Sequence, residues 1–213
     1  LSMTRYDFTT QPNRLNQNTM KWHEAESDPE LLELWVADMD FLPVPEIRDA
    51  VINYAETHIF GYPYPSDELY QSIIDWEKNQ HGYSVDKASI VLIEGVVPAI
   101  STAIQSFTKE DDAVLINTPV YQSFARSVRL NNRKLIENSL VKVNGHFEID
   151  FEQLERDIVD NDVKLYVFCS PHNPGGRVWT KEELTMVADR CQKHGVLLVS
   201  DEIHQDLALY GNK

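Results

Sequence analysis

Two continuous apolar runs near the end of the chain constrain the fold more than any other feature. They are KLYVFCS (residues 164–170) and VLLVSDE (196–202), and neither alternates polar with apolar side chains. Such a run is typical of a strand covered on both faces, as in a parallel sheet between two helical layers. The segment between them (180–195) has the spacing of a crossover helix, with a capping box at Thr180 and Glu183.

The same alternation of strand and helix extends toward the N-terminus. Further strands are expected at SIVLIEG (89–95), AVLINTP (113–119) and KLIENSLVKV (134–143), each followed by a segment with helical spacing. Two more helices are expected before them, one from Pro45 and one over about residues 67–80. This order predicts an α/β protein with a three-layer, doubly wound, mostly parallel sheet, preceded by an N-terminal arm and helical segment.

The charge of the chain limits its partners. The 213 residues include 34 acidic and 19 basic side chains, for a net charge of −15. Nucleic acids and anionic membrane surfaces bind cationic faces, so neither is expected as a partner. No apolar run approaches the roughly 18 residues of a membrane span. Cys169 and Cys191 are too few for a disulfide framework or a zinc site, so a cytoplasmic protein with reduced thiols and no metal is expected.

Ligands of a doubly wound sheet bind beyond the carboxyl ends of its strands, so the residues after each run are candidates. Gly95, Val96 and Val97 open a helix whose N–H groups could hold a phosphate. Taken alone, an ordinary strand-to-helix turn is favoured there by roughly three to one. Tyr121 follows the next strand and could lie against a bound ring, although a core aromatic residue is the commoner case.

Two polar side chains follow the two long apolar runs. Asn173 lies between Pro171 and Pro174, so its stiffly held amide could donate to a ligand oxygen, and a simple turn explains it equally well. Asp201 ends a buried strand, where a carboxylate needs a cationic partner, unless it serves as a helix N-cap. A phosphate site, a stacking ring, an amide donor and a buried carboxylate together describe a pocket for pyridoxal 5′-phosphate (PLP).

Five motifs resemble the class I/II aminotransferase superfamily of fold-type I PLP-dependent enzymes. They are WVADMDF (35–41), GVVPAI (95–100), NTPVYQSF (117–124), SPHNPGGRVW (170–179) and VSDEIHQDL (199–207). The resemblance covers essentially the whole chain. The last two motifs are specific to the PatB/MalY branch of cystathionine β-lyases.

The resemblance implies a role for each cofactor-facing residue. Asp201 would pair with the pyridine nitrogen, and Asn173 would hydrogen-bond the phenolic oxygen of the ring. His204 would approach the same oxygen, and Tyr121 would stack on the ring. The phosphate would be held by three backbone groups, those of Gly95, Val96 and Val97.

Other implied residues lie nearer the N-terminus. Tyr62 would reach the cofactor phosphate of a partner subunit, and Ala37 and Asp38 would line the substrate side of the pocket. The full-length protein would therefore be a homodimer that acts on a small amino-acid substrate. Residues 1–44 would form the N-terminal arm and part of the small domain, and residues 45–213 the PLP-binding large domain.

The length of the chain departs from the family pattern. Such enzymes usually run to nearly twice this length, and their Schiff-base lysine lies in a Ser-rich stretch some tens of residues beyond the DEIH motif. Lys213 has no such flank and follows Asp201 too closely, so no residue here is assigned the catalytic lysine's role. The large domain is expected to be truncated before that lysine. Leu1 and Ser2 precede Met3, which we interpret as a two-residue remnant ahead of the native start.

The resemblance implies C–S β-elimination for the full-length protein, in the manner of a cystathionine β-lyase that gives thiol, pyruvate and ammonia. An aminotransferase is the alternative, since both reactions begin with loss of the substrate's α-proton. A third interpretation is a non-catalytic, truncated binding module, which we expect of the isolated chain. A generic module for another phosphate-bearing ligand would require Asp201 to be only a helix cap and Asn173 only a turn residue.

Overall fold

The computed structural model describes residues 6–28, 30–209 and 211. Residues that carried predictions but lie outside the described part are Leu1, Ser2, Met3 and Lys213. Contacts between Cα atoms divide the chain into two compact units, residues 1–76 and 77–213. The predicted domain boundary after residue 44 concerns the domains of a larger enzyme and stays a prediction.

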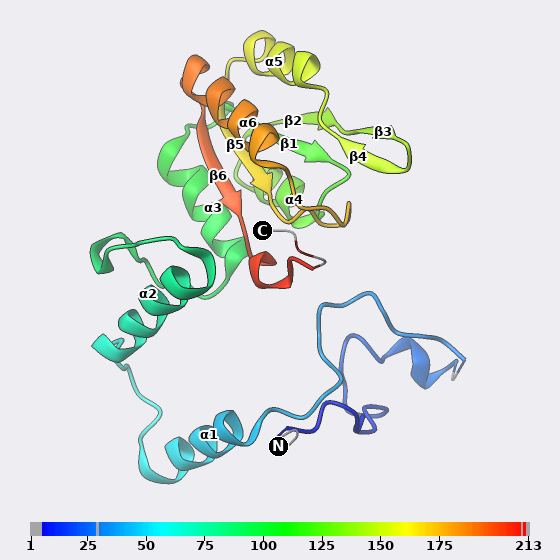
Figure 1. Cartoon of the computed structure of the whole chain (residues 1–213), viewed down its shortest axis with the longest axis vertical. Helices are drawn as coiled ribbons and strands as arrows, with labels where there is room; N and C mark the ends of the chain where they lie inside the picture. Colours follow the sequence, from blue (N-terminus) through cyan, green and yellow to red (C-terminus); the bar gives the residue numbers. More distant parts are fainter. Residues whose placement is uncertain (1–5, 29, 210, 212–213) are drawn as a thin grey trace. The chain divides into compact units, whose positions relative to one another are not determined.

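A four-stranded parallel sheet in the order β2-β1-β5-β6 forms the centre of the second unit (Figure 1). Its strands are β1 (Ala113–Thr118), β2 (Lys134–Ser139), β5 (Val163–Cys169) and β6 (Leu197–Asp201). The two central strands, β1 and β5, are buried along almost their whole length. The prediction of a strand covered on both faces is thus confirmed for β5. It is wrong for β6, which is only partly buried and lies at the edge of the described sheet.

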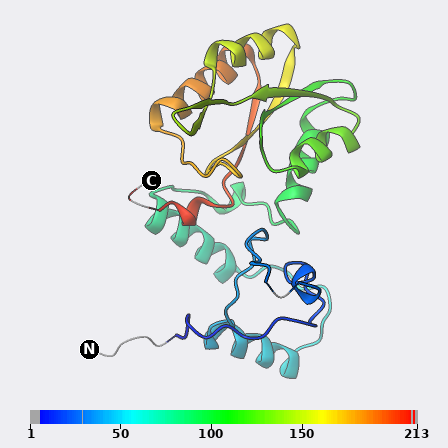
Figure 2. The same ribbon diagram turned by 90° about the vertical axis from the view of Figure 1, so that its right-hand side faces the viewer.

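Helices cover both faces of this sheet, as Figure 2 shows with α5 and α6 (yellow to orange) opposite α3 and α4 (green). The helices are α3 (Val96–Phe107), α4 (Ser123–Leu130), α5 (Phe151–Asp160) and α6 (Lys181–His194). The three layers confirm the predicted fold class.

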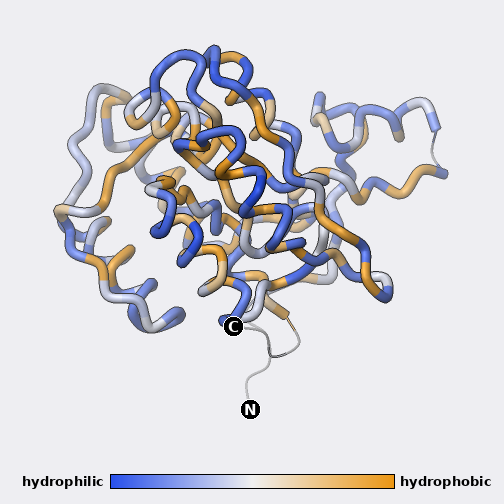
Figure 3. Tube along the Cα trace, turned by 90° about the horizontal axis from the view of Figure 1, so that it is seen from above, coloured by the Kyte–Doolittle hydropathy of each residue, from blue (hydrophilic) through white to orange (hydrophobic). Residues whose placement is uncertain are grey.

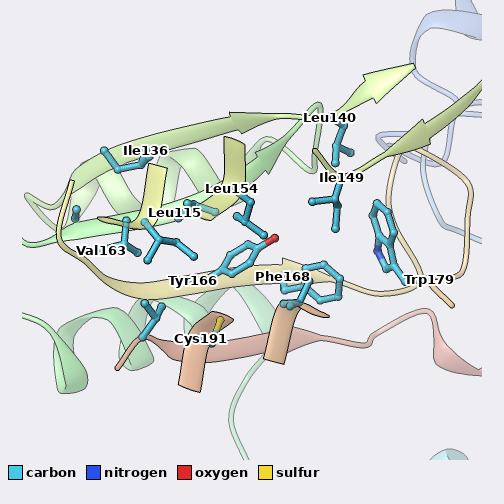
Figure 4. Packing of buried hydrophobic residues seen from close by; sticks show 14 residues of the cluster. Leu115, Ile136, Leu140, Ile149, Leu154, Val163, Tyr166, Phe168, Trp179 and Cys191 are labelled. Carbon is cyan, nitrogen blue, oxygen red and sulfur yellow. The ribbon is translucent and has the colours of Figure 1, made fainter. Parts of the chain in front are cut away.

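The sheet divides the core into two clusters, because successive side chains of a strand point to opposite faces. Leu115, Tyr166 and Phe168 lie on the side of α5 and α6 (Figure 4). Their neighbours Ile116 and Leu165 lie on the side of α3 and α4. The packing of both clusters keeps the strand ends in a fixed arrangement.

The capping box predicted for α6 is present. Thr180 Oγ1 accepts a hydrogen bond from the Glu183 N–H at 3.2 Å, and Glu183 Oε2 accepts one from the Thr180 N–H at 2.8 Å. Gly195 ends the helix in the left-handed conformation, at φ 66°. Hydrophilic and hydrophobic residues alternate over short intervals along the chain, within helices and outside them (Figure 3). This alternation is typical of amphipathic elements.

The prediction of a strand at residues 89–95 is wrong. Lys87–Ser89 form a short 3-10 helix (η2), and the apolar residues after it have no regular structure. Val91 is 83% exposed. A strand needs a neighbouring strand to pair its N–H and C=O groups. Residues 90–94 pair with none of the described strands, because the sheet consists of β2, β1, β5 and β6. An apolar pattern indicates a tendency to be buried, but it does not supply the partner.

The strand expected at residues 134–143 is interrupted. It breaks at Leu140, and the part beyond it, β3 (Val141–Val143), pairs antiparallel with β4 (His146–Glu148). The hairpin was missed in the sequence although its signal is present. The Asn144-Gly145 turn has φ of 49° and 87°, and Asn-Gly is the strongest short-range indication of a two-residue hairpin turn.

The first unit has less regular structure. It contains a short 3-10 helix, η1 (Glu24–Glu26), then α1 (Pro45–Thr57), and α2 (Asp67–His81) crosses from this unit into the second. Pro45 opens α1 as predicted, and α1 buries none of its residues. Within the described part of the chain, no helix combines the length and apolar character that a membrane crossing needs.

Replacing Leu115 with Ala tests the core beneath α5 and α6. Leu115 is fully buried in β1, so the cavity should lower the free energy of unfolding by about 2–5 kcal/mol in urea titrations. Leu130, 70% exposed at the end of α4, is the matched control, and Leu130→Ala should cost no more than about 0.5 kcal/mol. Equal effects at the two positions would contradict the assignment of the core.

Glu155 of α5 makes part of the stability pH-dependent. Its Oε1 accepts hydrogen bonds from Lys193 Nζ at 2.6 Å and His194 Nε2 at 2.9 Å, both in α6. These contacts, that of Lys193 first, lower the pKa of Glu155 from 4.5 to about 2. The stabilising effect is therefore complete above pH 4.5 and is lost as the pH falls toward 2.

We expect Glu155→Gln to lower the urea midpoint at pH 7 and to have a progressively smaller effect between pH 4.5 and pH 2, because the carboxylate becomes protonated first in the unfolded and then in the folded state. Glu152→Gln is the control, since Glu152 is 89% exposed and lies 3.9 Å from Arg156. A difference between Glu155→Gln and the unmodified chain that stayed constant with pH would refute the α5–α6 contact.

Candidate cofactor site

Three of the predicted site residues follow strands that end at the same edge of the sheet. Tyr121 comes after β1, Asn173 comes after β5, and Asp201 is the last residue of β6. The Tyr121 N–H donates to the Asn173 carbonyl at 3.0 Å, and the Ser170 N–H donates to the Asp201 carbonyl at 3.0 Å. Because the strands are parallel, their carboxyl ends bring these residues together.

Asp201 is a buried carboxylate without a cationic partner in the described structure. Its residue is 8% exposed, and Oδ1 accepts one hydrogen bond, from the Ile203 N–H at 3.1 Å. No ion pair among the described residues includes it. The helix-cap interpretation is wrong, because the next helix, η3 (Gln205–Leu207), has His204 as its N-cap. A carboxylate buried in this way is stabilised when a cation joins it.

Asn173 is held by its backbone, which leaves its amide available. Its N–H donates to Cys169 Sγ at 3.4 Å, and its carbonyl accepts from Tyr121. Its side-chain amide makes no hydrogen bond with any other described residue. Sequence reasoning missed Cys169, which donates in turn to the Pro171 carbonyl at 3.3 Å. Burial raises the pKa of this thiol to about 11, so it stays neutral beside Asp201.

Tyr121 stands at the margin of the core. The residue is 42% exposed, and its ring meets Phe124 edge-on, with centroids 6.1 Å apart. Phe124, by contrast, is fully buried. The core-aromatic interpretation of Tyr121 is therefore wrong, and one face of its ring can accept a planar partner.

Gly95 precedes the first turn of α3 in a conformation that favours glycine, at φ 152°. No side chain caps this helix start, so the N–H groups of Val96 and Val97 lack helical acceptors. Val96 packs against the core cluster that contains Cys169. In Figures 1 and 2, α3 begins at the end of the second unit where β6 ends, and the two elements are in contact.

A cavity of about 690 Å³ opens beside this edge. Its lining includes Asn173, His204, His172 and Arg177. Tyr121 and Asp201 do not line it, so only part of the predicted site faces this space. Among the residues that the structure covers, no group of three His, Cys, Asp or Glu side chains could hold a metal ion.

The remaining candidates belong to the first unit. Tyr62 is fully exposed between α1 and α2, and Ala37 is also exposed. Asp38 is bound by Arg14, whose Nη1 and Nη2 donate to its two carboxylate oxygens at 3.1 and 2.7 Å. Sequence reasoning missed Arg14, because 24 residues separate the two and no local pattern joins them. The roles of Tyr62, Ala37 and Asp38 stay predictions.

The chemistry of the second unit's residues fits PLP. The carboxylate of Asp201 can hold a protonated pyridine nitrogen, and the amide of Asn173 can donate to an oxygen on the same ring. The exposed ring of Tyr121 offers a stacking surface, and the start of α3 offers N–H groups to a phosphate. These assignments remain predictions for each residue.

Comparison with known proteins supports the same chemistry. The family model for aminotransferase class I and II matches residues 29–212. The cystathionine β-lyase PatB of Bacillus subtilis is 40% identical over 210 residues, which are 97% of this chain and 54% of PatB. The chain thus spans about half the length of the curated relatives it matches.

Two solved structures are similar in fold and sequence. Cystalysin of Treponema denticola, which contains PLP, gives a TM-score of 0.91 at 39% identity, over 99% of this chain and 55% of cystalysin. A PLP-bound C–S lyase from Staphylococcus hominis gives 0.90 at 30% identity, over 99% and 55%. With the match of the family model over most of its length, the chain belongs to the class I and II aminotransferase family of PLP-dependent enzymes.

Proposed function

We propose that this chain forms the cofactor-binding part of a PLP-dependent C–S β-lyase. The observation that carries the proposal is the buried carboxylate of Asp201 at the carboxyl end of β6, beside the loops of Asn173 and Tyr121. It has no cationic partner among the residues that the structure describes. The similarity to a cystathionine β-lyase and to C–S lyases supports the reaction type.

Each residue has a defined task in this proposal. Asp201 keeps a proton on the pyridine nitrogen, because a buried carboxylate strongly favours the cationic ring. Asn173 donates to the phenolic oxygen and fixes the ring's rotation in its plane. Tyr121 covers one face of the ring and excludes water from it. The N–H groups at the start of α3 hold the phosphate dianion.

When bound, PLP supplies an electron sink for the electron pair left at the substrate's α-carbon. In a lyase the substrate would lose a thiolate from its β-carbon. A proton would convert the thiolate to the thiol, and one water would hydrolyse the remaining three-carbon enamine to pyruvate and ammonia. In an aminotransferase, which the family name favours, the substrate would instead leave as a keto acid. The residues of this chain serve both outcomes, so the choice of a lyase depends on the relatives.

The partners and location of the full-length protein are also proposals. We propose a small amino acid with a sulfur-bearing β-carbon as substrate, a homodimer in which Tyr62 reaches the partner's phosphate site, and a cytoplasmic location. Burial raises the pKa of Cys169 and Cys191 to about 11, and such neutral thiols react slowly with oxidants.

The isolated 213-residue chain, without an assigned Schiff-base lysine, is expected to bind PLP at most weakly.

The reaction type is tested by supplying cystathionine to the full-length protein without a keto acid. We expect pyruvate release, measured with a coupled dehydrogenase, and no requirement for 2-oxoglutarate. The 213-residue chain should release none, and it is the control for background hydrolysis. Turnover that begins only when 2-oxoglutarate is added would show an aminotransferase.

Asp201→Asn tests the electrostatic role of the carboxylate. The amide keeps an oxygen for the Ile203 N–H but removes the charge, so PLP affinity in the full-length protein should fall at least about tenfold, or about 1.4 kcal/mol. Thermal stability should change little, because an unpaired buried charge is removed. Glu202→Gln alters the net charge equally at an exposed neighbour and should leave affinity unchanged. Equal affinities in the two variants would reject a pyridinium partner for Asp201.

A further inference from the structure

His172 is a buried histidine beside the site that the proposed function leaves without a role. It is 3% exposed and lies directly before Asn173. Its Nε2 lies 2.8 Å from the carbonyl oxygen of Pro119, two residues before Tyr121. A carbonyl oxygen can only accept, so Nε2 carries the proton and donates.

A second hydrogen bond runs in parallel with this one. The Tyr121 N–H donates to the Asn173 carbonyl at 3.0 Å. Two consecutive residues of the loop after β5 are therefore bonded to the loop after β1, one through a side chain and one through the backbone. The loops carry the amide donor and the stacking ring of the proposed site.

Packing holds the imidazole ring in one orientation. Its ring meets Trp179 edge-on, with centroids 5.5 Å apart, and the guanidinium of Arg177 lies 4.2 Å from the Trp179 ring on which it stacks. A Cβ at Gly175 would lie 2.6 Å from Cδ2 of His172, closer than any side chain tolerates. The glycine is therefore required for the ring to occupy this place.

The environment keeps the imidazole neutral. Burial lowers the pKa of His172, and the positive charge of Arg177, the charged group that faces it, acts in the same direction. Nδ1 is buried without a hydrogen-bond partner among the described residues. Backbone carbonyls of Pro119 and Cys169 act in the opposite direction, but the pKa is lowered overall. The neutral ring therefore carries its proton on Nε2, which donates to Pro119.

We propose that His172 is a positioning residue that fastens the Asn173 loop to the Tyr121 loop, so that the amide donor and the stacking ring are presented to the cofactor in one fixed geometry. This rests on the proposed function for the identity of the cofactor. The coupling of the two loops does not depend on it.

The test compares two substitutions at His172 in the full-length protein. His172→Phe keeps a ring against Trp179 but removes the donor, and His172→Gln keeps a donor without the ring. Hydrogen exchange of the Tyr121 N–H, followed by mass spectrometry before PLP is added, should be at least about tenfold faster in His172→Phe. PLP affinity should fall at least about tenfold in the same variant.

His172→Gln should restore both quantities to within about threefold of the unmodified protein. Exchange at Val167, in the middle of β5 and buried, should be the same in all variants. Unchanged Tyr121 exchange in His172→Phe, or equal damage in both variants, would overturn the positioning role and leave His172 a simple core residue.

Gly175→Ala provides a second route if His172→Phe fails to fold. It keeps His172 but displaces its ring, so the same two effects are expected, and their absence would count equally against the proposal. Gly61→Ala is the control, since nothing lies within 4 Å of its added Cβ. Asp201→Asn separates the hypotheses: if it leaves PLP affinity unchanged, the proposed function fails, whereas Tyr121 exchange still decides the loop coupling.

Discussion

The parallel pairing of β5 with β6 is the constraint on which the site depends. Its register places Cys169 beside Asp201, and the next backbone bond joins Ser170 to the Asp201 carbonyl. A shift by one residue would turn Asp201 to the opposite face of the sheet. It would also separate the carboxylate from the loop that carries Asn173. The apolar residues of β5 oppose such a shift, because it would exchange the side chains that pack in the two buried clusters, whose shapes differ.

Around this register, two titratable side chains are kept uncharged. The thiol of Cys169 and the imidazole of His172 both have pKa values moved by burial toward their uncharged forms. Each makes hydrogen bonds to the backbone, Cys169 to the Asn173 loop itself and His172 across to Pro119. Asp201 has no cationic partner among the described residues, while Arg177 and Glu148 line the cavity beside this edge of the sheet. Neutral donors can fix loop geometry without competing for a cation.

The first unit is organised in a different manner. Where the second unit relies on apolar packing, the arm relies on charge: Arg14 binds Asp38 and Asp40, and Lys21 donates to Asp40 at 2.6 Å. Trp22 adds a further donor to Asp40. The hydrogen bonds that Asp40 accepts, that of Lys21 first, lower its pKa to about 2. These contacts fix the backbone of the segment in which Ala37 and Asp38 were predicted to face the substrate, although α1 nearby buries no side chain.

The sequence by itself determined the elements whose signal is local: the buried strand β5, the position of the partly buried strand β6, the capping box of α6, and the order of candidates at the strand ends. Periodicity and capping act within a few residues, so they can be recognised without the fold. Only the tertiary structure decided that residues 90–94 form no strand, that Asp201 caps no helix and has no cationic partner in the described part of the chain, and that His172 reaches Pro119. Each of these depends on which distant backbone group or charge lies within about 3 Å, and no local pattern encodes that distance.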